Sequence, residues 1–199
     1  DPVNIITPPM AAGDRPRALP AVAAGSSAPA DLASAFNTTG LYADGATFGE
    51  TDGMDSGGAA YSATLLGATQ TWKNVQFNIG PAAAPDAITC AGQVIALPQG
   101  KYASLWLLGT GVQGNQVGQV FTVTYADGTT AKLVQNFSDW FRPQDFPGES
   151  RAIKMPHRVM ASGATDPRPF YLYTYGFSLD PAKEVKSITS PSNENIKIL

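Results

Sequence analysis

Short runs of residues that alternate between apolar and polar recur along most of the chain, separated by clusters of Gly, Asn and Asp. Alternation with a period of two is typical of β-strands that bury one face. Ten such runs begin after about Asp31, among them VQFNIG, QVFTVTYADG and PFYLYTYGFSL. Only DPAKEV suggests a helical turn, and no long stripe has helical spacing. The pattern predicts an all-β antiparallel sandwich of the jelly-roll type.

The most regular stretch, from Gln119 to Trp140, predicts a β-hairpin. A three-residue loop, Ala126 to Gly128, keeps the apolar side chains on one face, whereas a two-residue loop would place Lys132 beside Val123. Gly128 then takes the left-handed conformation, where a Cβ is costly. The expected pairs are Phe121 with Leu133, Thr122 with Lys132, Val123 with Ala131, Thr124 with Thr130, Tyr125 with Thr129 and Val117 with Phe137. This hairpin is predicted to be scaffold.

A second informative run is FYLYTY, in which Tyr171, Tyr173 and Tyr175 share one face of a strand. Phe170, Leu172 and Thr174 take the other face. The alternation leaves open which of the two faces is the core.

The first thirty residues contain six of the sixteen prolines, together with Ala, Gly and Ser. Proline lacks a backbone donor, so this segment is not expected to pair within a central sheet. We therefore predict a linker or arm over residues 1–31 and a sandwich module over residues 32–199. The arm either tethers the module to another domain or lies along its surface. The abrupt start at Asp1, with no signal peptide visible, is what a mature or excised product would show.

The amino-acid composition of the chain argues against several functional classes. Apolar residues make up 43% of the chain and charged residues 15%, with a net charge of −3. Nucleic-acid binding, which normally needs a basic face, is therefore not expected. A membrane span is not expected either, because no apolar stretch approaches the roughly 20 residues required. Cys90 is the only cysteine, so no internal disulfide forms, and it is expected to be a buried apolar side chain.

The sequence offers few candidates for catalysis. No G-x-S-x-G motif is present, and a single histidine, His157, argues against both a catalytic triad and a zinc site. A hydrolase would have to use carboxylates, and the candidates are Asp139 and Glu149.

An acidic, Gly-rich stretch precedes Tyr61, and no Lys or Arg occurs between Ala18 and Trp72. Carboxylates crowded in a loop repel one another unless solvent or a cation separates them. Asp52 and Asp55 are therefore candidate ligands of a structural calcium ion, although the stretch lacks the EF-hand pattern. The alternative is a solvated acidic turn.

Basic residues instead gather in a Pro- and Gly-rich region between Arg142 and Arg168, which is predicted to be a long loop. Arginines in such a loop either bind a ligand or pair with the neighbouring carboxylates. Sugar rings stack on aromatic side chains, so Trp72 and Trp140 are candidate platforms, whereas Trp106 is expected to be buried. The candidate ligand-binding residues are Trp72, Trp140, Arg142, His157 and Arg158.

The order of several segments resembles a known group of modules. These segments include FNTTGLYADG, DGMDSGGAAYSATLLG, YASLWLLGTG, FTVTYADGTTAKLVQNFSDW and YLYTYGFSLDPAKEVKSITSP. From about Leu32 onward they are similar to the galactose-binding-like β-sandwich modules of secreted bacterial glycoside hydrolases and some serine-carboxyl peptidases. The resemblance implies a jelly-roll sandwich, secretion, an early-loop calcium and an accessory role that is often carbohydrate binding.

These observations together predict a non-catalytic extracellular accessory module that binds carbohydrate. Its expected partners are a polysaccharide and a catalytic domain of the same precursor. The alternatives are a structural or interaction domain that stabilises a neighbouring catalytic domain, and a hydrolase that uses Asp or Glu residues.

Overall fold

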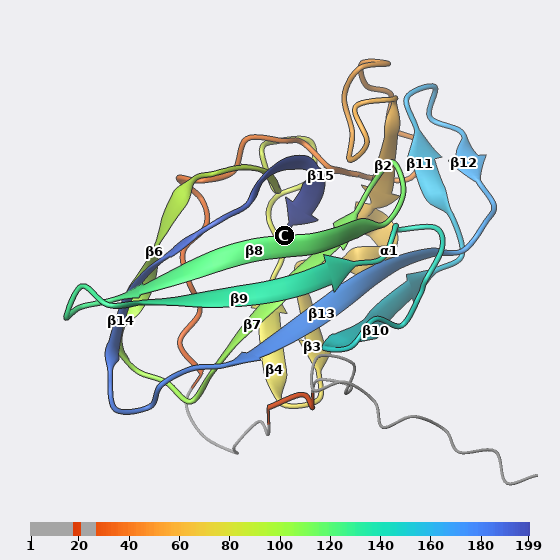
Figure 1. The fold of residues 1–199 in the computed structure, drawn as a ribbon. Coiled ribbons are helices and arrows are strands. Elements are labelled where there is room, and N and C mark those ends of the chain that lie inside the picture. The colour runs from red at the N-terminus through yellow and green to blue at the C-terminus, as the bar shows by residue number, and fades with distance from the viewer. Residues whose placement is uncertain (1–17, 21–26) are drawn as a thin grey trace, which may run out of the picture.

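The computed structural model describes residues 18–20 and 27–199 and consists mainly of antiparallel strands (Figure 1). Its central layer is a five-stranded antiparallel sheet. The order across this sheet is β10 (Glu149–Met155), β13 (Phe170–Ser178), β7 (Ser104–Gly111), β15 (Ser192–Ile198) and β5 (Ile88–Ala91).

A four-stranded antiparallel sheet packs on one face of the central sheet. Its order is β6 (Val94–Lys101), β14 (Glu184–Thr189), β8 (Gln116–Tyr125) and β9 (Thr130–Phe137). Buried side chains from both sheets, such as Phe121 and Phe137 on one side and Tyr175 and Phe177 on the other, form a common core. The predicted β-sandwich is therefore confirmed.

Smaller elements cover the opposite face of the central sheet. One is a second four-stranded sheet of β1 (Leu41–Tyr42), β2 (Ala59–Ser62), β11 (Arg158–Met160) and β12 (Thr165–Asp166). A hairpin of β3 (Thr69–Trp72) and β4 (Val75–Asn78) and the helix α1 (Ala63–Leu66) follow β2 in the chain. The Ser62 hydroxyl caps α1 by accepting a hydrogen bond from the Leu65 amide at 3.1 Å.

Strand β13 is buried on both of its faces. Tyr173, Tyr175 and Phe177 belong to the core between the two large sheets. Phe170 and Leu172 belong to the second core, together with Tyr61 and Trp140. The alternation in the sequence left the core face open, and the structure uses both faces because layers cover the sheet on each side.

The predicted hairpin forms between β8 and β9. Phe121 pairs with Leu133, Thr122 with Lys132, Val123 with Ala131 and Thr124 with Thr130, as predicted. Gly128 has φ of 82°, which confirms the left-handed position. The predicted pair of Val117 with Phe137 is wrong, because Gln116 takes that place. A bulge at Val117 and Gly118 shifts the register by one residue and leaves Val117 63% exposed.

Two predictions, one of a long loop and one of a helical turn, are wrong. The region from Arg142 to Arg168 is not one long loop, because β10, β11 and β12 lie within it. Strand β10 forms by pairing with β13 at the edge of the central sheet, a contact that the local Pro and Gly content hides. DPAKEV forms a turn that leads into β14, not a helix.

Within the described part of the chain, no helix is long and apolar enough to cross a membrane.

Most of the predicted arm, residues 1–17 and 21–26, lies outside the described residues. Pro20 lies against β13, where a Cβ added to Gly176 would come within 3.0 Å of Pro20 Cδ and within 2.7 Å of the Trp106 ring. Gly176 is therefore required for a close approach of the Trp106 ring to the sheet.

Cys90 is buried, as predicted, and burial raises the pKa of its thiol to about 12.

A buried carboxylate joins the segment before β5 to the start of β1. Asp86 is fully buried, and its two oxygens accept hydrogen bonds from the amides of Gly40 (2.7 Å) and Leu41 (3.1 Å). Burial raises the pKa of Asp86 to about 7, while the two amide hydrogen bonds oppose this rise.

The Asp86 pKa predicts a pH dependence of stability. The pKa in the unfolded chain is about 3.9, so the folded state holds the proton more tightly. The contribution of Asp86 to the free energy of unfolding is therefore complete below about pH 4 and is lost as the pH rises through about 7. Urea unfolding at several pH values should show this loss in the wild type and not in Asp86→Asn. A carboxyl carbon NMR titration with a midpoint near 4 would contradict the prediction.

Candidate functional site

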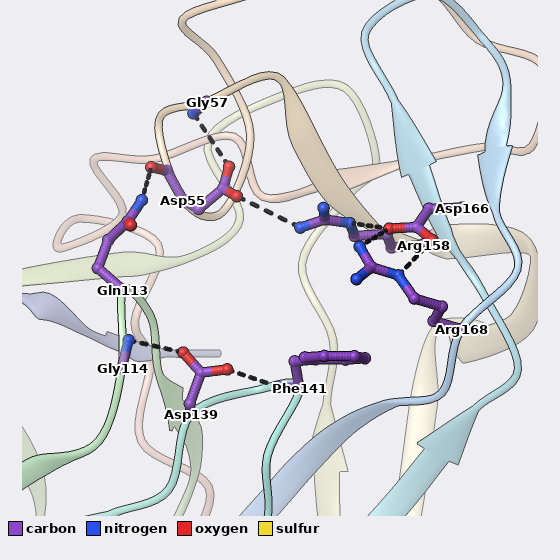
Figure 2. A network of polar contacts seen from close by, with 9 residues as sticks. All are labelled: Asp55, Gly57, Gln113, Gly114, Asp139, Phe141, Arg158, Asp166 and Arg168. Atoms are coloured by element: carbon purple, nitrogen blue, oxygen red, sulfur yellow. Dashed lines mark hydrogen bonds and ion pairs between the residues drawn. The ribbon is translucent and has the colours of Figure 1, made fainter.

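A small pocket opens where several loops meet at one end of the second core. Its volume is about 210 Å³, and eight residues line it: Asp55, Gln113, Asp139, Trp140, Phe141, Arg158, Arg168 and Phe170. They come from the loop before β2, the β7–β8 loop, the segment after β9, the start of β11, and the β12–β13 connection with the start of β13. Figure 2 shows the polar members and Phe141 arranged around a central opening.

Arg158 holds one wall of the pocket together. Its Nη1 lies 3.4 Å from Asp55 Oδ2, and its Nε donates to Asp166 Oδ2 at 3.0 Å (Figure 2). The guanidinium carbon lies 5.0 Å from the centre of the Trp140 ring and 4.7 Å from that of Phe170. Its side chain is only 15% exposed, so this cation is held between two carboxylates and two aromatic rings.

Arg168 forms a second, more exposed contact with the same carboxylate. Its guanidinium binds both oxygens of Asp166, with Nε donating to Oδ1 at 2.7 Å. The guanidinium carbon lies 4.6 Å from the centre of the Phe141 ring. The hydrogen bond from Arg168 and the charge of Arg158 hold the pKa of Asp166 below its usual value. Arg168 is 50% exposed and can therefore reach a ligand in the pocket.

Asp139 fixes the opposite wall. Its carboxylate accepts hydrogen bonds from the amides of Gly114 and Phe141, each at 2.8 Å (Figure 2). Its own amide donates to Asn115 Oδ1 at 3.0 Å. Asp139 therefore ties the β7–β8 loop to the segment after β9, and both of its carboxylate oxygens already have backbone partners.

The structure does not support the candidate role of Trp140 as a stacking platform for sugar rings. Its side chain is 4% exposed and packs edge-on against Tyr61 at 5.3 Å and Phe170 at 5.0 Å between ring centres. The main chain of Trp140 also pairs with Gly111 and Tyr171. Trp140 supports the pocket from below and is covered by Arg158, so it is not an open stacking platform.

The structure brings together only part of the predicted ligand set. Arg158 and Trp140 line the pocket, whereas Trp72, Arg142 and His157 do not. Trp72 is half-buried on β3, 5.4 Å from the Trp106 ring, which is also half-buried. Arg142 is exposed beside Phe141.

His157 lies in a separate contact with Asp44. The His157 Nε2 atom is 3.0 Å from Asp44 Oδ2, and the Ser62 hydroxyl donates to Asp44 Oδ1 at 2.6 Å. Burial alone would raise the pKa of Asp44, but the hydrogen bonds from Ser62 and His157 hold it below its usual value. This pairing joins the start of β11 to the cap of α1.

The arrangement of Asp52 and Asp55 does not fit a calcium site. Asp52 Oδ2 accepts a hydrogen bond from the Gly49 amide at 3.2 Å. Asp55 accepts from the Gly57 amide at 3.0 Å and pairs with Arg158. Calcium needs six to eight oxygen ligands, and among the described residues no group of three or more His, Cys, Asp or Glu is placed to hold a metal ion. The cation that neutralises Asp55 is an arginine from a distant part of the chain.

Glu149, the other candidate for hydrolysis, is held by scaffold residues. Its carboxylate accepts from the Ser138 amide (2.8 Å), the Ser138 hydroxyl (2.5 Å) and the Tyr175 hydroxyl (3.0 Å). Burial raises the pKa of Glu149, and these hydrogen bonds partly offset the rise. Glu149 does not line the pocket.

Sequence reasoning missed Gln113, Phe141, Asp166 and Arg168 as members of one site. Gln113 carries no signal in the sequence, since its Nε2 donates to the carbonyl of Asp55, 58 positions away, at 3.3 Å. The pairing of Arg168 and Arg158 with Asp166 is the alternative in which the loop arginines bind neighbouring carboxylates.

Comparison with known proteins gives one finding. The sequence model of a family described as the AziU2-like beta-sandwich domain matches residues 26–199. The search of curated proteins found no match to the chain.

Removing the Arg158 side chain is expected to destabilise the fold. Arg158→Ala leaves Asp55 without its cation and uncovers the rings of Trp140 and Phe170. We expect the free energy of unfolding, measured in urea, to fall by about 2–3 kcal/mol. Arg151→Ala is the control, because its pair with Asp145 is exposed, and it should cost less than about 1 kcal/mol. Equal losses in the two variants would contradict a structural role for Arg158.

Calcium is expected to leave the stability unchanged. The carboxylates of Asp52 and Asp55 are engaged by backbone amides and by Arg158 and are not grouped around a cation position. The thermal midpoint should therefore be the same in EDTA and in millimolar calcium. A rise of the midpoint in calcium that Asp52→Asn abolishes would show that a calcium site exists in this loop.

Proposed function

The chain belongs to the family of AziU2-like β-sandwich domains, and we propose that it is a non-catalytic binding module whose loop pocket takes one sugar unit of a carbohydrate. The observation that carries the proposal is the lining of this pocket, which combines hydrogen-bond donors and acceptors with the half-buried ring of Phe141 around a small opening. Sugar hydroxyls need both donors and acceptors, and sugar rings need an apolar wall.

The pocket size supports a single ring. About 210 Å³ is below the roughly 300–1,000 Å³ of pockets that hold drug-sized ligands, and it corresponds to about seven water molecules at roughly 30 Å³ each. A long polysaccharide could enter only with one terminal or protruding unit.

The charges of the pocket support a neutral ligand. Arg158 and Arg168 are already paired with Asp55 and Asp166, and Asp139 adds a third carboxylate to the site, so an anion would meet no unpaired cation among the described pocket residues. An ionic ligand would have to break these pairs, whereas hydroxyl groups can add to the remaining donor and acceptor positions of Arg168, Gln113 and Asp55.

The engagement of the acidic residues supports binding over catalysis. A glycoside hydrolase needs two carboxylates free to act on one bond. Both carboxylate oxygens of Asp139 accept hydrogen bonds from backbone amides, and the Glu149 carboxylate accepts hydrogen bonds from Ser138 and Tyr175. Secretion, attachment to a hydrolase and the finer galactose-binding-like jelly-roll assignment stay predictions of the resemblance.

A second candidate is an interaction domain that contacts a neighbouring catalytic domain. The outer face of the β6–β14–β8–β9 sheet exposes Val94 (69%), Val120 (37%) and Val134 (57%). Val120 and Val134 are direct cross-strand partners, so they form a contiguous apolar area. Exposed apolar area on a sheet face favours contact with another protein surface.

Sugar binding can be tested by titrating a panel of neutral monosaccharides and oligosaccharides into the isotopically labelled protein and following amide NMR shifts. We expect saturable shifts at the loops that contain Gln113 and Phe141. Arg168→Gln should weaken binding by about tenfold, because hydrogen bonds to charged groups are worth roughly 1.5–3 kcal/mol.

Arg142→Gln is the matched control, since Arg142 is exposed in the same region but does not line the pocket. Its affinity should equal that of the wild type. The absence of saturable shifts with every sugar would reject the proposal and favour the interaction domain. An equal loss in both variants would place the sugar elsewhere.

A further inference from the structure

A second and larger cavity lies between the central sheet and the β6–β14 half of the other sheet. Its volume is about 800 Å³, and it shares no lining residue with the loop pocket. Its walls include Leu105 and Leu107 of β7, Ile95 and Leu97 of β6, Phe121 of β8 and Ile188 of β14. The segment of residues 27–33, drawn in orange in Figure 1, also contributes to the lining.

The cavity continues through a gap in the central sheet as far as the β3–β4 hairpin, whose residues 74–80 also line it. Strand β15 pairs with β7 only at Gly109 to Gly111, and the Leu199 amide donates to the Leu108 carbonyl at 3.0 Å. Along Ser104 to Leu107, β7 pairs with β13 on one edge, and no strand among the described residues pairs with its other edge. The lining accordingly includes side chains from both faces of β7, such as Trp106 and Leu107.

The gap also supplies hydrogen-bonding groups. In a strand, the backbone groups of alternate residues point toward the same neighbouring strand. Since the Leu108 carbonyl points toward β15, the N–H and C=O groups of Trp106 point into the gap. The cavity thus combines extensive apolar walls with one pair of main-chain polar groups at its mouth.

The charges at the cavity argue for a neutral ligand. Asp31 and Lys101 are the charged side chains among its described lining residues. Lys101 also faces Glu184 directly across the β6–β14 pair. Of these three, only Asp31 and Lys101 line the cavity, so the described lining holds one carboxylate and one ammonium and carries no net charge.

We propose that this cavity binds a neutral, mainly apolar small molecule that carries one hydroxyl, carbonyl or amine group, with that group hydrogen-bonded to the main chain of Trp106. Apolar side chains make up most of the cavity walls, and releasing water from them favours an apolar ligand. Water is held weakly by apolar walls. A volume of about 800 Å³ lies within the range of small-molecule sites. This site is independent of the proposed sugar pocket.

The test uses the full chain and the neutral fluorescent probe N-phenyl-1-naphthylamine. We expect saturable one-to-one binding that 1-decanol displaces and ionised decanoate does not. Amide hydrogen exchange at Trp106 should slow when 1-decanol is bound. Absence of saturable binding overturns the proposal, and equal displacement by decanoate overturns the assignment of a neutral ligand.

Variants locate the probe. Leu107→Trp fills the cavity from the half-buried inner face of β7 and should weaken binding by about tenfold or more. Leu105→Phe is a smaller substitution that also fills the cavity. It replaces Leu107→Trp in the test if circular dichroism shows that Leu107→Trp is unfolded. Val134→Trp places the same indole on the exposed outer face of β9 and should leave binding unchanged. Wild-type affinity in a folded Leu107→Trp would show that the probe binds elsewhere.

Discussion

The arrangement of the whole molecule depends on the burial of β13 on both faces. Every second residue from Tyr171 to Phe177 is aromatic, and the residues between them are Leu172, Thr174 and Gly176. Because apolar side chains project from both sides, one covering sheet is not enough. The β6–β14–β8–β9 sheet covers one side, and the β1–β2–β11–β12 sheet with Trp140 covers the other. The loop pocket lies where this second covering meets the end of the central sheet.

The same requirement explains the chemistry of the loop pocket. The second core ends at Trp140 and Phe170, whose ring faces would otherwise meet solvent. Arg158 covers them with a planar cation, and Asp55 and Asp166 then neutralise that cation. The ion pairs therefore have a structural origin, and any ligand has to use the polar positions that remain. A neutral molecule rich in hydroxyl groups meets that condition better than an ion does.

Local patterns in the sequence predicted the features that depend on neighbouring residues. The register of β8 with β9 and the conformation at Gly128 follow from alternation and loop length. The bulge at Gly118 was not predictable, because it depends on Asn136 of the partner strand, which accepts a hydrogen bond from the Gly118 amide at 2.7 Å.

In the candidate site, too, residue types could be predicted from the sequence, whereas contacts with distant residues could not. Arg158 and Trp140 were predicted as binding residues from their types and loop context. Trp140 does not serve as an open platform, because Arg158 and Tyr61, which cover it, are distant in sequence. The calcium hypothesis depended on unneutralised carboxylates near Asp55, and the neutralising arginine lies 103 positions away in the chain. Residue type thus indicates which groups can form a site, but only the packing of layers decides whether a charged group meets a ligand or another part of the fold.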